Sequence, residues 1–176
     1  GGDYDDHLTE SGQRQAQELA QELVGKGIEV IYSSPRFRAQ ETAGAVAKFL
    51  SVPIETIEDL RERNSYGVLS GLTKDEAKEK YPEEVAELVA NKPHQAVQGC
   101  ESYDAIKSRA GKVFTEIFNK DRQTVAIVAH GEIIKTYISE FVTKEQSLKL
   151  GDCAVLEINK KGEQLDLSCF ARAELV

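Results

Sequence analysis

Short apolar runs with the length of buried strands alternate with longer segments of helical periodicity, and this alternation limits the possible folds more than any other feature. Strands are predicted at residues 28–32, 54–57 and 124–129, of which the last is the clearest. The predicted helices lie at residues 9–23, 34–50, 73–90 (interrupted at Pro82), 102–118 and 133–142. Ser34 is the expected N-cap of the second helix, with Pro35 in its first turn, and residues 73–76 form a capping box at the start of the third. Strands that alternate with helices form a mostly parallel sheet. We therefore expect an α/β fold, a three-layer sandwich with helices on both faces of the sheet.

The end of the chain has a different pattern. Residues 153–158 and 165–170 are strand-like and flank Lys160-Lys161-Gly162, which is typical of a hairpin. This hairpin is expected to add an antiparallel edge near the C-terminus. The 176 residues contain no internal repeat and no linker-like composition, so a single domain over residues 1–176 is expected.

Composition restricts the partners. Hydrophobic residues make up 40% of the chain and the formal net charge is −8, which is typical of a globular protein that repels nucleic acid and anionic lipid. No apolar run reaches membrane-spanning length. The three cysteines are scattered without metal-ligand spacing, which favours reduced thiols in a cytoplasmic protein. We expect neither a nucleic-acid nor a membrane partner, and the oligomeric state stays open, with a homodimer as one alternative.

Charged and imidazole side chains follow each predicted strand. Arg38 comes soon after the first strand, Glu62 soon after the second, and His130-Gly131 directly after the third. Ligands of open α/β sheets bind at the carboxyl ends of the strands, where helix N-termini favour anions. An arginine can clamp a phosphate and a carboxyl group can act as a general acid. Each residue alone has an ordinary structural explanation, but their combination favours phosphoryl transfer.

Several segments resemble the histidine phosphatase superfamily, which has the phosphoglycerate-mutase-like fold. Residues 8–16 resemble its L-T-x-x-G-x-x-Q-A segment, and residues 33–43 its S-S-P-x-x-R-A-x-x-T-A segment. Residues 60–62 resemble its L-x-E segment. Residues 99–102 with Arg109 resemble its G-x-E-S…R pattern, and residues 125–131 the strand before its second histidine. The matches follow the family's order along nearly the whole chain.

The resemblance implies a role for each candidate catalytic residue. Arg38 would clamp the transferred phosphoryl group, His130 would hydrogen-bond its equatorial oxygens as a cation, and Glu62 would protonate the leaving oxygen and then help to activate water. Gly131 would contribute to substrate binding at the start of the last helix. The family needs no metal, and we expect neither a metal nor a cofactor.

One family motif is not found in the sequence. The nucleophilic histidine belongs to an Arg-His-Gly motif that ends an interior strand of the sheet, and the only His-Gly pair here is His130-Gly131, preceded by Ala129. We expect that the natural protein has this strand, that the domain as given lacks it, and that these 176 residues are inactive by themselves. The interval from Glu62 to Gly67 is also one residue longer than in the family.

The reaction has two alternatives within the family. Arg63, Tyr66 and Lys74 lie in a segment that resembles the substrate loop of cofactor-dependent phosphoglycerate mutases, and are candidate substrate-binding residues. The insertion that carries an arginine pair in those mutases is short here, which favours a phosphatase for small phosphorylated metabolites that acts through a phosphohistidine. The mutase is the first alternative, and an inactive relative that binds a phosphorylated ligand or a partner protein is the second.

Overall fold

A computed structural model describes residues 5–89, 97–143 and 148–175. Its central sheet has the strand order β2-β1-β3, formed by β1 (Val30–Ser33), β2 (Ile54–Thr56) and β3 (Val125–Val128). All three strands are parallel, with Ile31 opposite both Ile54 and Ala126. β1 is fully buried because it has a neighbour on each side, whereas the three residues of the edge strand β2 are exposed. The predicted parallel sheet is confirmed.

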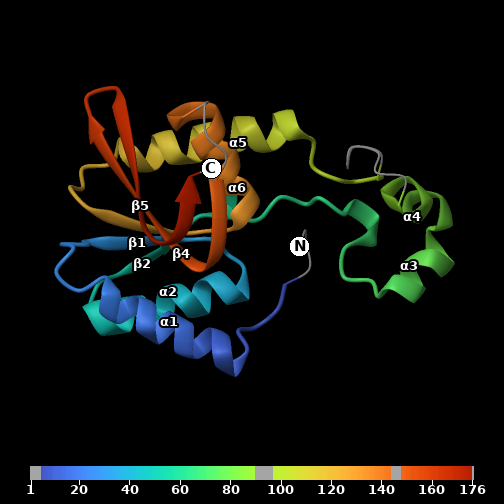
Figure 1. The fold of residues 1–176 in the computed structure, drawn as a ribbon, viewed down its shortest axis with the longest axis horizontal. Helices are drawn as coiled ribbons and strands as arrows, with labels where there is room; N and C mark the ends of the chain where they lie inside the picture. Colours follow the sequence, from blue (N-terminus) through green and yellow to red (C-terminus); the bar gives the residue numbers. More distant parts are fainter. Residues whose placement is uncertain (1–4, 90–96, 144–147, 176) are drawn as a thin grey trace.

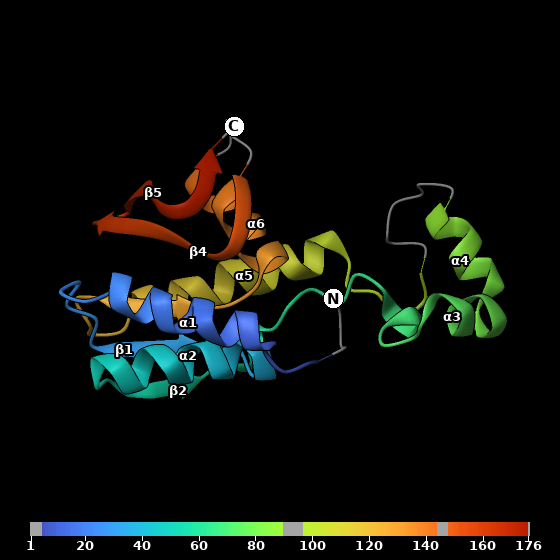
Figure 2. The ribbon, with the colours of Figure 1, turned by 60° about the horizontal axis from the view of Figure 1, so that its bottom comes forward.

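Helices cover both faces of this sheet, which confirms the three-layer arrangement (Figures 1 and 2). On one face, Ile31 packs against α1 (Glu10–Glu22) and α2 (Phe37–Leu50). On the other, Val30 and Tyr32 pack against α5 (Tyr103–Phe118) and α6 (Gly131–Tyr137). Because side chains alternate along a strand, one apolar strand supplies both cores. A π-helical turn (Ile138–Val142) follows α6 within the segment predicted as one helix.

The C-terminal hairpin differs from the expectation. Its strands β4 (Leu148–Lys161) and β5 (Gln164–Leu175) are longer than predicted and pair only with each other among the described residues, as a separate antiparallel sheet. The predicted antiparallel strands near the C-terminus are thus confirmed, and they differ from the expectation in forming a sheet of their own. Side chains attach the hairpin to the body: Arg172 makes a two-pronged ion pair with Glu22 at 2.9 Å, and Lys26 reaches Glu157 at 3.1 Å.

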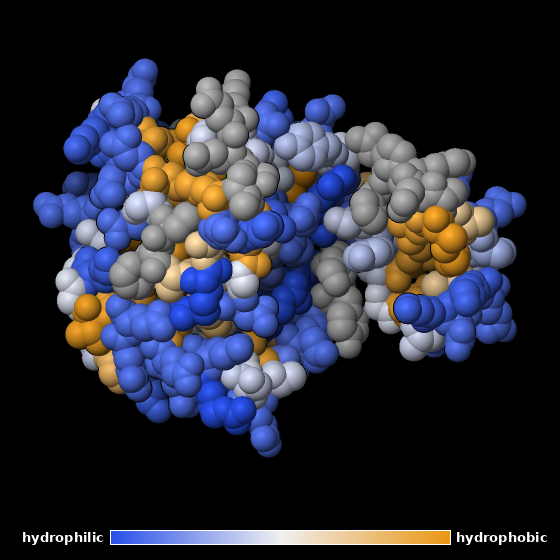
Figure 3. Space-filling model, in the orientation of Figure 1, coloured by the Kyte–Doolittle hydropathy of each residue, from blue (hydrophilic) through white to orange (hydrophobic). Residues whose placement is uncertain are grey.

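A small helical module projects from the carboxyl ends of the strands (Figures 1 and 2). It contains η2 (Gly67–Leu69), α3 (Lys74–Lys80) and α4 (Pro82–Val89), and has its own small apolar cluster around Leu69, Ala77 and Val97. Thr73 and Glu76 form the predicted capping box, and Pro82 separates the two helices. Figure 3 shows hydrophobic atoms gathered on this module.

Among the described residues, no helix has the length and apolar character that a membrane crossing would need.

The start of α2 was predicted incorrectly. Ser34 was expected to cap the helix with Pro35 in its first turn, but the helix begins at Phe37 and Arg36 is the N-cap residue. The carboxylate of Asp5 takes the capping role, because both of its oxygens accept from the backbone N–H of Phe37 at 2.9 Å. A residue 32 positions away thus satisfies the helix end and leaves the Ser34 hydroxyl available for another contact.

Candidate active site

His130 lies where β3 ends and α6 begins. It is the N-cap residue of α6, and its side chain is buried, with 8% of the residue exposed. Its Nε2 lies 2.7 Å from Oγ of Ser34, which directly follows β1. The hydrogen bond connects the carboxyl ends of two neighbouring parallel strands, where an open α/β sheet places its ligands.

The surroundings of His130 disfavour its charged form. Burial, and after it the positive charges of Arg38 and Arg36, lower its pKa from the ordinary value to about 4. Asp5 acts in the opposite direction. The imidazole is therefore neutral near pH 7 without a bound anion. An anion placed between His130 and Arg38 would raise this pKa. Binding of an anion would therefore be coupled to protonation of His130.

Arg38 belongs to the first turn of α2 and forms an ion pair with Asp5, with 3.6 Å between Nη1 and Oδ1. Asp5 therefore contacts both the N-terminus of α2 and the guanidinium group. About a third of each side chain or less is exposed, so the pair lies at the edge of the domain rather than in open solvent. This arrangement holds Arg38 at the end of β1, where its charge reaches His130.

Glu62 reaches the same region from the loop after η1 (Glu58–Leu60). One of its carboxylate oxygens accepts from the backbone N–H of Arg63 at 2.9 Å. The other accepts from the backbone N–H of Glu132 at 3.4 Å, in the first turn of α6 and two residues after His130. The structure therefore places Arg38, Glu62 and His130 around the ends of β1 and β3, and Gly131 forms the start of α6 beside them.

Arg109 holds the loop that carries Glu62. Its guanidinium group, with 7% of the side chain exposed, makes a two-pronged pair with Glu101 at 2.8 and 2.6 Å. Its Nη1 also donates to the backbone carbonyls of Asp59 and Arg61, at 2.8 and 2.9 Å. One buried side chain thus fixes the backbone on the N-terminal side of Glu62 to the start of α5.

The other predicted binding residues lie farther along the chain. Arg63 donates from Nε to the backbone carbonyl of Glu101 at 3.1 Å, and so belongs to the same loop support. Tyr66 is exposed and is the N-cap residue of η2, and Lys74 is the first residue of α3. Both views show α3 apart from the strand ends (Figures 1 and 2). The roles of Tyr66 and Lys74 in substrate binding stay predictions.

Sequence reasoning missed three contributors to this site: Ser34, Asp5 and Arg36. Ser34 was interpreted as a helix cap, and Asp5 was not singled out. One signal in the sequence did point to the charge of Arg36 near His130: Arg36, like Arg38, follows β1 within a few residues. Within the described ranges, no group of three histidine, cysteine or acidic residues has an arrangement that could hold a metal ion.

Comparisons with known proteins relate the chain to a phosphatase and to a mutase. The chain is 36% identical over 131 residues to phosphoserine phosphatase 1 of Hydrogenobacter thermophilus, a match that covers 73% of this chain and 61% of that enzyme's length. It is also 36% identical over 172 residues to the 2,3-bisphosphoglycerate-dependent phosphoglycerate mutase of Parvibaculum lavamentivorans, covering 90% of this chain and 81% of the mutase.

A solved structure and a family profile extend the likeness to the whole fold. The structure of Bacillus stearothermophilus YhfR superposes with a TM-score of 0.77 at 28% identity, covering 96% of this chain and 86% of YhfR. The profile of the histidine phosphatase superfamily (branch 1) matches residues 1–171. This protein belongs to the histidine phosphatase superfamily.

Proposed function

We propose that the chain is the body of a phosphatase that hydrolyses small phosphorylated metabolites through a phosphohistidine. The observation that carries the proposal is the neutral, buried His130 at the ends of two parallel strands. It is hydrogen-bonded to Ser34, and the charge of Arg38 lowers its pKa. A site of positive charge with a histidine that gains a proton on anion binding suits a phosphate dianion. The family membership supports the same chemistry.

In the proposed reaction, Arg38 and a protonated His130 bind the equatorial oxygens of the transferred phosphoryl group. A nucleophilic histidine nitrogen forms a bond to phosphorus while the bond to the leaving oxygen breaks, and Glu62 gives its proton to that oxygen. Glu62 then accepts a proton from the water that hydrolyses the phosphohistidine. Arginine and histidine supply the charge neutralisation that phosphoryl transfer requires, so we propose that no metal takes part.

The nucleophile would come from a further strand of the full-length protein, paired with the free edge of β3. In the described residues β3 pairs only with β1, and its four residues are half-buried where those of β1 are buried. The two apolar clusters also continue beyond β3 to the hairpin, through Leu156 and Ile158 on one face and Val155 on the other. A strand between β3 and β4 would satisfy the backbone groups at this edge and join both clusters.

A mutase is the second candidate, because the match to the Parvibaculum lavamentivorans mutase covers 90% of this chain. A mutase must keep its phosphohistidine away from water until the phosphoryl group returns to a substrate. The projecting module of α3 and α4 stands apart from the strand ends in both views, which supports the phosphatase instead (Figures 1 and 2).

The free thiols of Cys100 and Cys153 suit the cytoplasm, the compartment that we propose.

The test uses the full-length gene product, in the presence of EDTA. Phosphoserine and 3-phosphoglycerate carry a radiolabel in their phosphoryl group. We measure the acid-labile label on the protein, the free phosphate and the 2-phosphoglycerate. We expect a transient phosphohistidine on a histidine outside residues 5–175, and release of free phosphate. Conversion to 2-phosphoglycerate without phosphate release would favour the mutase. Absence of any phosphoprotein would favour a non-catalytic binder, and loss of activity with EDTA would contradict the metal-free mechanism.

A further inference from the structure

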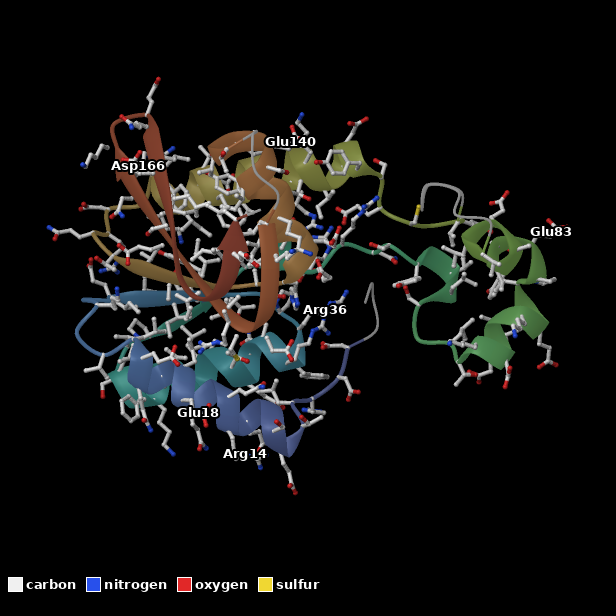
Figure 4. All side chains as sticks on the ribbon, viewed as in Figure 1. Arg14, Glu18, Arg36, Glu83, Glu140 and Asp166 are labelled. Carbon is white, nitrogen blue, oxygen red and sulfur yellow. The ribbon has the colours of Figure 1, made fainter. Side chains whose placement is uncertain are left out.

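The hydroxyl group of Ser34 contacts the imidazole of His130, but the proposed reaction gives it no role. Ser34 directly follows β1 and is completely buried, with 0% exposed. Its Oγ lies 2.7 Å from Nε2 of His130 and accepts from the backbone N–H of Arg36 at 3.3 Å. Among the described residues, these are the two hydrogen-bond partners of this oxygen. Figure 4 shows Arg36 at the carboxyl end of β1.

The backbone of Ser34 is held by both neighbouring elements. Its N–H donates to the carbonyl of Val128 at 2.9 Å, at the end of β3 and two residues before His130. Its carbonyl accepts from the side-chain amide of Gln40, which belongs to α2. The position of Oγ relative to the imidazole is therefore set by the central sheet and by α2.

The donors and acceptors at Ser34 determine which nitrogen of His130 carries the proton. A serine hydroxyl has one hydrogen to donate and two lone pairs that accept. The backbone N–H of Arg36 occupies one lone pair. A buried hydroxyl hydrogen needs an acceptor, and within the described part of the chain that acceptor is Nε2 of His130. In the neutral ring Nε2 therefore accepts from Ser34, and the proton lies on Nδ1.

The same contact serves the charged ring. When His130 gains a second proton on binding an anion, Nε2–H becomes a donor, and the hydroxyl of Ser34 turns so that its second lone pair accepts. Nδ1 keeps its proton in both states. Among the residues that the structure describes, Nδ1 has no hydrogen-bond partner, and His130 retains 8% exposure. One ring nitrogen is thus committed to Ser34, and the other stays available for a ligand.

We propose that Ser34 is a positioning residue that keeps the proton of His130 on Nδ1, so that Nδ1–H donates to an oxygen of the transferred phosphoryl group. The inference rests on the proposed phosphatase function for its ligand, and it adds which atom of His130 makes the contact. The protonated nitrogen of a neutral histidine is set by the hydrogen bond that the other nitrogen makes. In the opposite tautomer the ring would direct a lone pair at the phosphoryl oxygens and repel them. An active-site histidine in the wrong tautomer loses most of its catalytic effect even where the geometry is intact.

The test measures the tautomer of His130 in the full-length protein at pH 7 without ligand, where the ring is neutral. NMR of isotope-labelled histidine distinguishes protonated from unprotonated ring nitrogens, and a His130→Gln variant identifies the signals. We expect the wild type to carry the proton on Nδ1 and Ser34→Ala to populate both tautomers. Ser34→Ala should also lower kcat/KM for p-nitrophenyl phosphate by about tenfold to a hundredfold.

Ser33→Ala is the matched control. It removes a second fully buried hydroxyl at the end of β1, which donates to the carbonyl of Ser34 at 3.1 Å. This variant should keep the tautomer and the activity of the wild type. A matching change of both in Ser33→Ala would show a general disturbance of the strand end and reject the specific role of Ser34.

The remaining outcomes separate the inference from the function on which it rests. A neutral wild-type ring with its proton on Nε2, or an unchanged tautomer in Ser34→Ala, would overturn the inference. A Ser34→Ala enzyme with wild-type activity would do the same. Because the tautomer is measured without substrate, a wild-type protein that releases no phosphate from p-nitrophenyl phosphate would overturn the phosphatase, and the NMR result would still decide where Ser34 holds the proton.

Discussion

The Arg38→Ala variant of the full-length enzyme is expected to lose about a thousandfold in kcat/KM for every phosphomonoester that the wild type hydrolyses. Arg38 lies in the first turn of α2, and its charge reaches His130 across the ends of β1 and β3. Removal of one preorganised donor to a developing oxyanion costs a hundredfold to a thousandfold, and arginines that stabilise transferring phosphoryl groups contribute about a thousandfold or more. Initial rates with p-nitrophenyl phosphate measure the loss.

Two further variants show whether the loss belongs to the guanidinium group. Arg38→Lys should recover only part of the activity, because an ammonium group does not reproduce two-pronged binding of phosphate. Arg14→Ala removes the same charge from the exposed surface of α1 and should retain wild-type activity (Figure 4). The clamp assigned to Arg38 would be wrong if Arg38→Ala kept activity near that of the wild type, or if Arg14→Ala lost as much.

The Arg109→Met variant is expected to lower the free energy of unfolding by about 3 to 5 kcal/mol. Arg109 is buried, and its removal leaves the Glu101 carboxylate and the carbonyls of Asp59 and Arg61 without their donors. Breaking a buried pair by removing one partner is costly because the remaining charge stays buried. Urea denaturation with linear extrapolation measures the change, and the thermal midpoint should fall by roughly 10 °C.

Arg122→Met is the matched control. Arg122 pairs with Glu29 at 3.7 Å, and more than a third of each side chain is exposed, so its loss should cost less than about 1 kcal/mol. Glu101→Gln should lower the stability less than Arg109→Met, because the arginine keeps its two backbone acceptors. If the free energy of unfolding of Arg109→Met lay within about 1 kcal/mol of the wild-type value, Arg109 would not be the group that holds the loop before Glu62.

The layers of the fold could be predicted because local patterns determine them. The apolar run at residues 124–129 became β3, the capping box at Thr73 began α3, and Ser102 capped α5 at the expected place. The hairpin was predicted as a pattern, but its attachment depends on distant pairs such as Arg172 with Glu22. Such long-range contacts leave no periodic trace in the sequence.

The candidate site was predicted from the residues that follow the strands, and its supports were not. Arg38, Glu62 and His130 could be found because the carboxyl ends of parallel strands meet at one edge. Ser34 escaped because a serine before a proline is typical of a helix cap, and Asp5 displaced it from that role across 32 residues of sequence. A contact between residues distant in sequence thus set the start of α2, and local patterns alone do not show it.

The protonation state of His130 provides the most direct test that this site binds phosphate. Without ligand, burial and the charges of Arg38 and Arg36 lower the pKa of His130 to about 4, so its ring is neutral at pH 6. A phosphate dianion beside the ring favours the protonated form, and its pKa must rise. NMR titration of the labelled histidine ring, assigned with a His130→Gln variant, should show a protonated His130 at pH 6 with saturating inorganic phosphate and a neutral one without it. A titration midpoint that phosphate leaves unchanged, at concentrations that inhibit the enzyme, would place phosphate binding elsewhere and contradict the account.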